Sequence, residues 1–262
     1  MRKYVGKWFL HQFMMEETRL HSYLPHTDSL NIQSFSNFLG NYQEVFLKPS
    51  SSSQGIGVVY VTFIAKDIYK IHKGYSQEIF HGNIANLYHY LKEKVLIKKH
   101  YLIQEKIDLA QIDDSPIDIR VMVQRKKNDL EWVITGKLAK VAAKGFVTTN
   151  AAVKLLSIAE VTNKLNVNRL PINKLTTNKL EQEIENLSLL LVKHLHSYFT
   201  DIHTFGLDIG IDNKGKIWII EANIYPVIIM FDNVEDKLMI QKILEYRRTI
   251  TTNSVHFTKK NI

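Results

Sequence analysis

The sequence predicts an α+β fold in two lobes, because strand-like and helix-like segments are mixed without strict βαβ alternation. Two segments, residues 84–97 and 178–198, carry apolar residues at the spacing of an amphipathic helix. Shorter segments rich in Val, Ile and Tyr are typical of strands, and several are joined by short polar turns that favour antiparallel hairpins. These observations together favour α+β over a doubly wound parallel sheet.

The first part of the chain is expected to begin with a helix over residues 7–23, which ends before Pro25. A strand over residues 45–48 runs into Pro49, and a second strand follows over residues 57–65. The amphipathic helix over residues 84–97 comes next, with a strand over residues 101–107 after it.

The remainder is expected to be mostly β, apart from two helices. Strands over residues 117–124 and 131–143 flank the turn KKND. The helix over residues 178–198 precedes a hairpin over residues 205–226, and a closing helix covers residues 234–247. Residues 163–177 are polar and aperiodic, so they are expected to be a connection. The sequence shows no internal repeat.

Composition bounds the class of protein. The chain has 262 residues, of which 45% are hydrophobic and 23% charged, as in ordinary soluble globular proteins. It has no cysteine, so disulfides and thiolate metal sites are excluded and a cytoplasmic location is expected. The N-terminal apolar run is interrupted by His11 and Gln12, which argues against a signal peptide. No stretch approaches the roughly 20 apolar residues of a membrane span.

The formal net charge is +8, from 34 basic and 26 acidic residues. This charge is compatible with anionic partners such as nucleotides. The basic residues are spread along the chain instead of being gathered in one arm, so most are expected to form a solvated surface. Nucleic-acid binding is therefore an unlikely main role.

The hairpin FGLDIGIDNKGKIWIIEANIYP, residues 205–226, carries polar residues among its isoleucines. If Lys214 and Gly215 form a two-residue loop, Asp208 lies opposite Glu221, and Asn223 shares their face. The expected core side holds Leu207, Ile209, Ile211, Trp218, Ile220 and Ala222, and the polar side is expected to include Ile217 and Ile219.

Two directly opposed carboxylates repel one another unless a cation lies between them. A set of oxygen ligands from carboxylates and an amide favours a hard ion such as Mg²⁺, with Mn²⁺ as a substitute. The alternative interpretation is an edge hairpin with one solvent-exposed face.

The loop KPSSSSQGIG, residues 48–57, has small side chains where a strand turns back, so its N–H groups could surround an anion. It matches neither GxxxxGK[ST] nor GxGxxG. Lys48 could place a cation on a phosphate. The alternatives are a mobile serine-rich hairpin tip and a surface lysine.

Two further strands carry polar groups of interest. YLIQEKIDL ends its apolar run at Gln104 and Glu105, where the backbone could bind a ligand. IDIRVMVQ places Asp118 and Arg120 on one strand face. Arg120 could stabilise charge on a transferring phosphate, or it could form an ion pair with little effect on stability.

In this order, the motifs resemble the ATP-grasp superfamily, most closely its YheC/YheD-like branch of endospore coat-associated proteins. The similarity runs from GKWFLHQF and YLPHT to EANIYP, and the DIRV segment also resembles ribosomal-protein glutamate ligases. The resemblance implies an ATP-grasp fold whose two α+β lobes, residues 1–100 and 101–262, grip a nucleotide. It also implies that the separate N-terminal domain of many members is absent here.

The resemblance further implies a set of site residues. Nucleotide contacts are expected from Lys7 and Lys48, from the loop residues Ser52, Ser53, Gly55 and Gly57, and from the adenine hinge Gln104, Glu105, Lys106 and Ile107. Mg²⁺ ligands are expected at Asp208, Glu221 and Asn223, and catalytic residues near the triphosphate at Arg120, Lys140 and Asn150.

The implied activity is that of an ATP- and Mg²⁺-dependent carboxylate–amine ligase working through an acylphosphate, for example one that adds an amino acid to a peptide or protein. Its partners would be ATP, a carboxylate substrate and an amine acceptor. The alternative is a non-catalytic nucleotide-binding or spore-coat module. It is motivated by Ser52 and Ile56, where relatives carry a glycine and a basic residue, and by Ala151 and Ala152, which replace a glycine pair.

Overall fold

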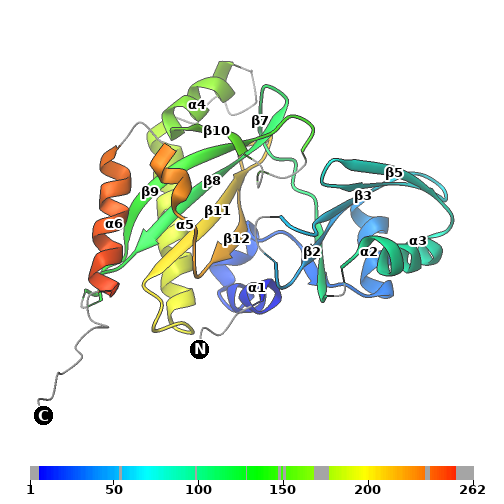
Figure 1. Cartoon of the computed structure of the whole chain (residues 1–262), viewed down its shortest axis with the longest axis horizontal. Coiled ribbons are helices and arrows are strands. Elements are labelled where there is room, and N and C mark those ends of the chain that lie inside the picture. The colour runs from blue at the N-terminus through cyan, green and yellow to red at the C-terminus, as the bar shows by residue number, and fades with distance from the viewer. Residues whose placement is uncertain are drawn as a thin grey trace, which may run out of the picture.

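The computed structural model describes residues 6–52, 55–97, 99–127, 129–146, 149, 152–167, 177–233 and 237–251. Two sheets lie side by side, each with its own helices (Figure 1). Within the described ranges, no helix combines the length and apolarity needed to cross a bilayer.

The first sheet has the strand order β1-β6-β2-β3-β4-β5 and is antiparallel throughout. Its strands are β1 (Thr27–Ser29), β2 (Glu44–Pro49), β3 (Val59–Ala65), β4 (Ile68–Lys73), β5 (Ser76–His81) and β6 (Tyr101–Glu105). Helices α2 (Ile32–Tyr42) and α3 (Ile84–Tyr90) pack against it, and α3 continues into a π-helical turn, Leu91–Val95. Phe35 and Leu87 from these helices are fully buried against Val45 and Ile103.

Helix α2 is defined by both of its ends. Asn31 caps its N-terminus by accepting hydrogen bonds from the backbone N–H groups of Gln33 and Ser34, both at 2.9 Å. The helix ends at Gln43, which has a φ of 59° in the left-handed region. A residue with a Cβ is unfavourable in that conformation, whereas glycine is not.

Substitution Gln43→Gly is therefore expected to raise the free energy of unfolding by about 0.5–1 kcal/mol. Urea denaturation would measure the change. Gln43→Ala is the matched control, because it removes the same exposed side chain but keeps the Cβ. If alanine stabilised the protein as much as glycine, backbone strain would not be the cause.

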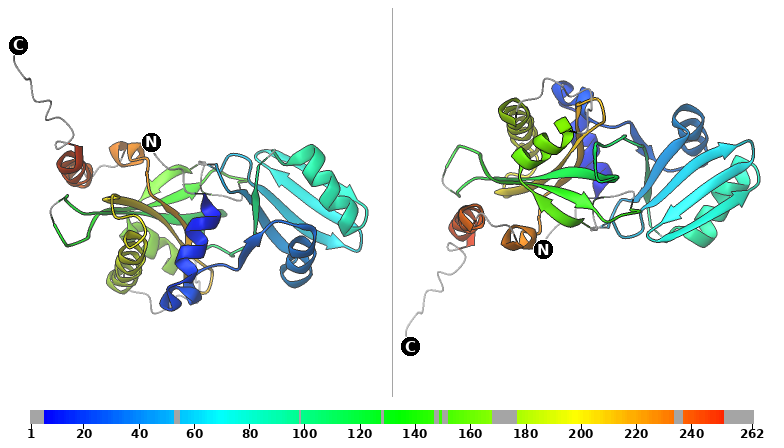
Figure 2. Two further views of the ribbon diagram at one scale, coloured as in Figure 1. Left: turned by 90° about the horizontal axis from the view of Figure 1, so that it is seen from below. Right: turned by 90° about the horizontal axis from the view of Figure 1, so that it is seen from above.

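The second sheet has the order β10-β9-β8-β11-β12, and β7 pairs with β8. Its strands are β7 (Gln111–Ile112), β8 (Ser115–Gln124), β9 (Val133–Ala142), β10 (Ala152–Leu156), β11 (Thr204–Ile211) and β12 (Ile217–Asn223). The main core lies between one face of this sheet and helices α1 (Lys7–Met15), α4 (Ile158–Val167) and α5 (Thr177–His196). Helix α6 (Lys237–Thr251) and the 3₁₀ turn Ile229–Asn233 cover part of the other face (Figure 2).

Only part of that second face is covered. Met122 of β8 packs against Phe231 and Ile243 from the covering elements. Asp118 and Arg120 share the face with Met122, because side chains alternate along a strand, but they lie nearer the first sheet, where Asp118 lines a cleft. This face of β8 therefore packs into a small core at Met122 and lines the cleft at Asp118.

The predicted helix over residues 7–23 is in fact two elements: α1 ends at Met15, and a 3₁₀ helix covers Thr18–Tyr23. Leu10 and Met14 of α1 belong to the core of the second sheet, although β1 and β2 follow them in the first. Strand β6 lies after residue 100 and still pairs within the first sheet. The chain therefore crosses between the sheets both after α1 and after Glu105.

The β11–β12 hairpin pairs Asp208 with Glu221, as predicted, but by a different route. Asp212 pairs with Lys216 through its backbone N–H at 2.9 Å, so the loop has three residues, 213–215, and not two. Gly215 takes a φ of 86°, as expected at the end of such a loop. A register shift between Asp208 and Ile209 then restores the predicted pairing.

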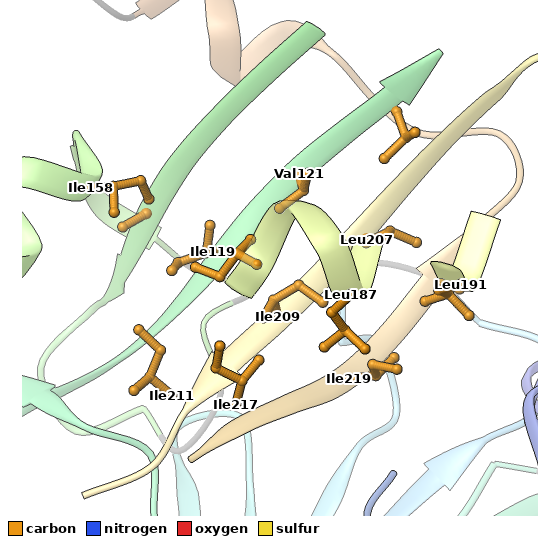
Figure 3. Close-up of a cluster of buried hydrophobic side chains, with 14 of the residues drawn as sticks. Ile119, Val121, Ile158, Leu187, Leu191, Leu207, Ile209, Ile211, Ile217 and Ile219 are labelled. Atoms are coloured by element: carbon orange, nitrogen blue, oxygen red, sulfur yellow. The ribbon is translucent and has the colours of Figure 1, made fainter. Parts of the chain in front are cut away.

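Because the loop is one residue longer than predicted, the predicted faces of residues 217–220 are wrong. Ile217 and Ile219 point into the core with Ile209 and Ile211, toward Leu187 and Leu191 of α5 (Figure 3). Ile220, predicted to face the core, lines the cleft beside Glu221. Trp218 is also outside the core, and its Nε1 donates to Asp212 Oδ2 at 3.0 Å.

Candidate functional site

A cleft of about 700 Å³ opens between the two sheets and is lined by residues from both. It gathers most of the predicted site residues, namely Lys7, Lys48, Ser52, Gly55, Gln104, Glu105, Lys106, Ile107, Asp208 and Glu221. Gly57, Arg120, Lys140 and Asn223 are not among the residues that line it. Ser53 and Asn150 lie outside the described residues.

Asp208 lies deep in the cleft wall, bound by two buried cations. Arg120 donates to it through Nε at 2.8 Å and Nη2 at 3.0 Å, a bidentate pair. Lys140 Nζ donates to the same carboxylate at 2.9 Å. Burial alone would raise the pKa of Asp208, but Lys140 and Arg120 outweigh it and lower the pKa to about 2. Asp208 is therefore ionised, and Arg120 pairs with it instead of with its strand neighbour Asp118.

Asp118 is a cleft residue that the sequence analysis did not assign to the site. Its Oδ1 lies 3.1 Å from Lys140 Nζ, an ion-pair contact without hydrogen-bond geometry, and its Oδ2 accepts a hydrogen bond from Thr149 Oγ1. Burial raises its pKa to about 6, in spite of the nearby Lys140 ammonium. Its place on the strand face of Arg120 was the one available signal.

Asp118 should make the stability of the protein depend on pH. Its pKa is raised from 3.8 to about 6, so the folded protein holds this proton more tightly than the unfolded chain does. The free energy of unfolding should consequently fall by up to about 3 kcal/mol as the pH rises from about 4 to above 6. Asp208 adds no slope there, because its lowered pKa stabilises the fold fully above pH 3.8 and is lost only toward about pH 2.

Substitution Asp118→Asn is expected to remove that fall, and the difference between wild type and variant at pH 4 and pH 7 isolates it from other groups. Urea denaturation at both pH values would measure the difference. Parallel pH profiles for the two proteins would contradict the prediction.

Glu221 lines the cleft next to Asp208, its partner in the β11–β12 register, and is partly exposed. Lys7 Nζ, from the first turn of α1, donates to its Oε1. Asn223, two residues after Glu221 on β12, has its Nδ2 3.5 Å from Asp208 Oδ2. The hairpin register thus brings two carboxylates and one amide together.

The donor chemistry fits a hard divalent cation. Asp208 and Glu221 lie on one wall of the cleft, and both supply oxygen ligands. Among the residues that the structure describes, no group of three or more His, Cys, Asp and Glu side chains forms a complete metal site. Mg²⁺ commonly completes a small set of carboxylate ligands with water and phosphate oxygens.

The opposite part of the cleft combines a lysine with apolar walls. Lys48 Nζ donates to Gln104 Oε1, and Gln104 Nε2 donates in turn to Thr27 Oγ1 at 2.8 Å. Burial lowers the pKa of Lys48 to about 8. Apolar lining comes from Phe46, Val58 and Tyr60 in the first sheet and from Ile220 on β12, none of which was predicted as a site residue. An apolar wall beside a lysine can accept a flat base on one side and anionic groups on the other.

The side chains of the predicted hinge point to protein partners. Glu105 Oε1 accepts from the backbone N–H of His26 at 2.7 Å. Lys106 Nζ pairs with Glu44 at 3.0 Å and with Asp108 at 2.8 Å. The backbone N–H groups of Glu105 and Lys106 are also bonded within the protein, to the His26 carbonyl at 3.0 Å and the Glu44 carbonyl at 3.3 Å.

The loop after β2 contributes Ser52 and Gly55 to the cleft. The Ser52 hydroxyl is buried and has no hydrogen-bond partner among the described residues, so a ligand oxygen could satisfy it. Gly57 instead has a structural role: its φ is 80°, and a Cβ there would lie 3.0 Å from Pro49. Tyr101 secures this point by donating to the Gly57 carbonyl at 2.9 Å.

The chain is similar to several known proteins. The chain is 24% identical over 266 residues to endospore coat-associated protein YheD of Bacillus subtilis (strain 168), covering 97% of this chain but only 56% of YheD. Among solved structures, it is similar to an ADP complex of N5-carboxyaminoimidazole ribonucleotide synthetase, with a TM-score of 0.53 and 12% identity over 92% of this chain and 51% of the other. D-alanyl-alanine synthetase A from Vibrio cholerae O1 biovar eltor str. N16961 gives a TM-score of 0.52 and 10% identity over 93% and 64%.

These two structures show a shared fold. A family model described as YheC/D like ATP-grasp matches residues 1–250. The chain therefore belongs to the YheC/D-like ATP-grasp family.

Proposed function

We propose that this chain is an ATP- and Mg²⁺-dependent carboxylate–amine ligase that works through an acylphosphate. The observation that carries the proposal is the convergence of Asp208, Glu221 and Lys48 on one cleft between the sheets. Two solved structures with this fold support it, since one is a synthetase with bound ADP and the other a D-alanyl-alanine synthetase.

In this proposal the base of ATP lies against the apolar wall of Phe46 and Ile220, next to the hinge backbone. Lys48, Lys7 and the Ser52 hydroxyl bind the phosphates. Asp208, Glu221 and Asn223 would hold Mg²⁺, which would supply charge neutralisation at the transferring phosphate. Arg120 and Lys140 keep Asp208 ionised and oriented through their hydrogen bonds.

A substrate carboxylate attacks the γ-phosphorus, and the bond to the β-phosphate oxygen breaks, which gives ADP and an acylphosphate. The amine of the acceptor then attacks the acyl carbon and expels phosphate, and the amine proton passes to solvent. Holding the reactants in line is the main task of the protein in such a transfer, so no protein nucleophile is needed.

The test is ADP release from ATP and Mg²⁺ on addition of amino acids together with peptide or protein acceptors, with the mass of each acceptor measured afterwards. A ligase gives ADP only with a correct pair and a mass increase equal to the added acid minus water. ADP release with no mass change would contradict ligation and indicate simple hydrolysis.

A second candidate is nucleotide binding without turnover, in a structural or coat-associated module. One observation favours it: neither Arg120 nor Lys140 lines the cleft, because both are bound to Asp208. Calorimetry with ATP and Mg²⁺ distinguishes the candidates, since tight binding without ADP under every acceptor would favour the module. Association with the endospore coat, taken from the name of YheD, is a further proposal for this chain.

A further inference from the structure

The two opposed carboxylates of the cleft are both paired with cations of the protein, but the pairs differ in kind. Asp208 binds Arg120 and Lys140, whose side chains are only 10% and 5% exposed and come from other strands of the same sheet. Glu221 binds Lys7, a residue of α1; the Lys7 side chain is 17% exposed and the Glu221 side chain 28% exposed. The first set is locked into the sheet, whereas the second lies at the surface of the cleft.

The backbone of Lys7 is fixed, so only its side chain can move. The backbone N–H of Lys7 donates to the Ser50 carbonyl at 2.9 Å. Gly6 packs so closely that a Cβ there would lie 2.7 Å from Ser50 Oγ. Beyond this anchored turn, four rotatable bonds carry an ammonium group, which needs no fixed geometry to form an ion pair.

The Lys7 ammonium also takes up space that a cation on Glu221 would need. It contacts Glu221 Oε1 directly, and two cations cannot share one side of a carboxylate oxygen without strong repulsion. Lys48 is close as well, since Glu221 raises and Lys7 lowers its pKa, although burial has the larger effect. An anion entering the cleft would therefore meet two ammonium groups.

We propose that Lys7 is the exchangeable counter-ion of Glu221, which it releases to a divalent cation when a polyphosphate offers Lys7 another partner. The proposal rests on the nucleotide binding proposed above. Before nucleotide arrives, Lys7 holds the carboxylate in the cleft and opposes metal binding. With nucleotide, the ammonium moves from carboxylate to phosphate, and the cation binds between them.

This exchange makes metal and nucleotide binding cooperative. Nucleotide removes the group that competes with the metal, so each ligand must tighten the other by the same factor. Substitution Lys7→Met should separate the two effects: it should strengthen binding of the metal alone and weaken the enhancement by nucleotide. A lysine that contacts only phosphate would give no tighter binding of the metal alone.

The experiment is titration with Mn²⁺, with the free ion measured by electron paramagnetic resonance, first without nucleotide and then with saturating ADP. Lys7→Met is expected to lower the Kd for Mn²⁺ alone by about 10-fold or more, as removal of a neighbouring positive charge implies. Lys7→Arg keeps the charge and should remain within about 2-fold of wild type.

Lys126→Met is the matched control, because it changes the net charge equally. Lys126 forms an ion pair with Glu245, at an N–O distance of 2.8 Å, and neither residue lines the cleft. It should leave Mn²⁺ binding unchanged. An unchanged Kd in Lys7→Met, or an equal gain in Lys126→Met, overturns the exchange. Failure of ADP to bind wild type overturns instead the proposed function, on which the cooperative step depends. Thermal melting confirms that each variant is folded.

Discussion

Substitution Asp208→Asn is expected to lower the free energy of unfolding by about 3–5 kcal/mol, because it leaves two buried cations without their carboxylate. Arg120 would lose both of its hydrogen bonds to an anion, and Lys140 would keep only its contact with Asp118. The amide is nearly the same size, so packing is preserved and the loss is electrostatic. Urea denaturation followed by tryptophan fluorescence would measure it.

A double variant tests the cause. If repulsion between the unpaired cations is responsible, Asp208→Asn combined with Lys140→Met should be more stable than Asp208→Asn alone. Additive losses in the double variant would contradict this explanation. The pH dependence provides a second check, since Asp208 stabilises the wild type fully above pH 3.8 and loses its effect as the pH falls toward about 2.

Substitution Glu221→Gln is expected to reduce ADP release by about 100-fold or more and to change the free energy of unfolding by less than about 1 kcal/mol. Glu221 is partly exposed and its one ion pair, with Lys7, is accessible to solvent, so little folding energy depends on it. Glu221 is nevertheless the more accessible of the two carboxylates proposed as metal ligands, since Asp208 is buried. ADP release under saturating substrates would measure the effect.

The control for this prediction is Glu245→Gln, which removes one charge from an exposed ion pair with Lys126. It should leave both turnover and stability nearly unchanged. Turnover of Glu221→Gln at the wild-type rate would show that this carboxylate does not hold the metal. The contrast with Asp208→Asn is itself informative, because two carboxylates that face each other in the register are expected to serve stability and chemistry unequally.

The sequence could predict the hairpin because its information is local. Alternating apolar residues and the turn Asp212 to Gly215 define two antiparallel strands, and the pairing of Asp208 with Glu221 is confirmed. The predicted two-residue loop was wrong by one residue, and the bulge was not predicted. The two errors cancel at Glu221, but they do not cancel at Ile217 and Ile219, whose faces were reversed.

Other misses have different physical reasons. Helix α2 was not predicted, although the sequence has a local signal for it: Asn31 caps a segment that carries Phe35 and Leu39 at helical spacing. Strand β5, SQEIFH, is mostly exposed and shows no clear apolar alternation. The partners of Asp208 could not be deduced from the residues alone, because Arg120 lies 88 positions away in the chain and only sheet order brings it close.

The three-residue loop and the bulge of the β11–β12 hairpin restrict how this segment can change in length. Deleting one residue between Ile217 and Ile219 while keeping the loop and the bulge would slide Ala222 into line with Asp208. Deleting Ile220, the extra residue of the bulge, would instead leave Ile219 opposite Ile209 and Glu221 opposite Asp208. A shorter hairpin that keeps the Asp208–Glu221 pair must therefore lose its residue from the loop or the bulge, so single-residue deletions between Ile217 and Ile219 should be far rarer than substitutions.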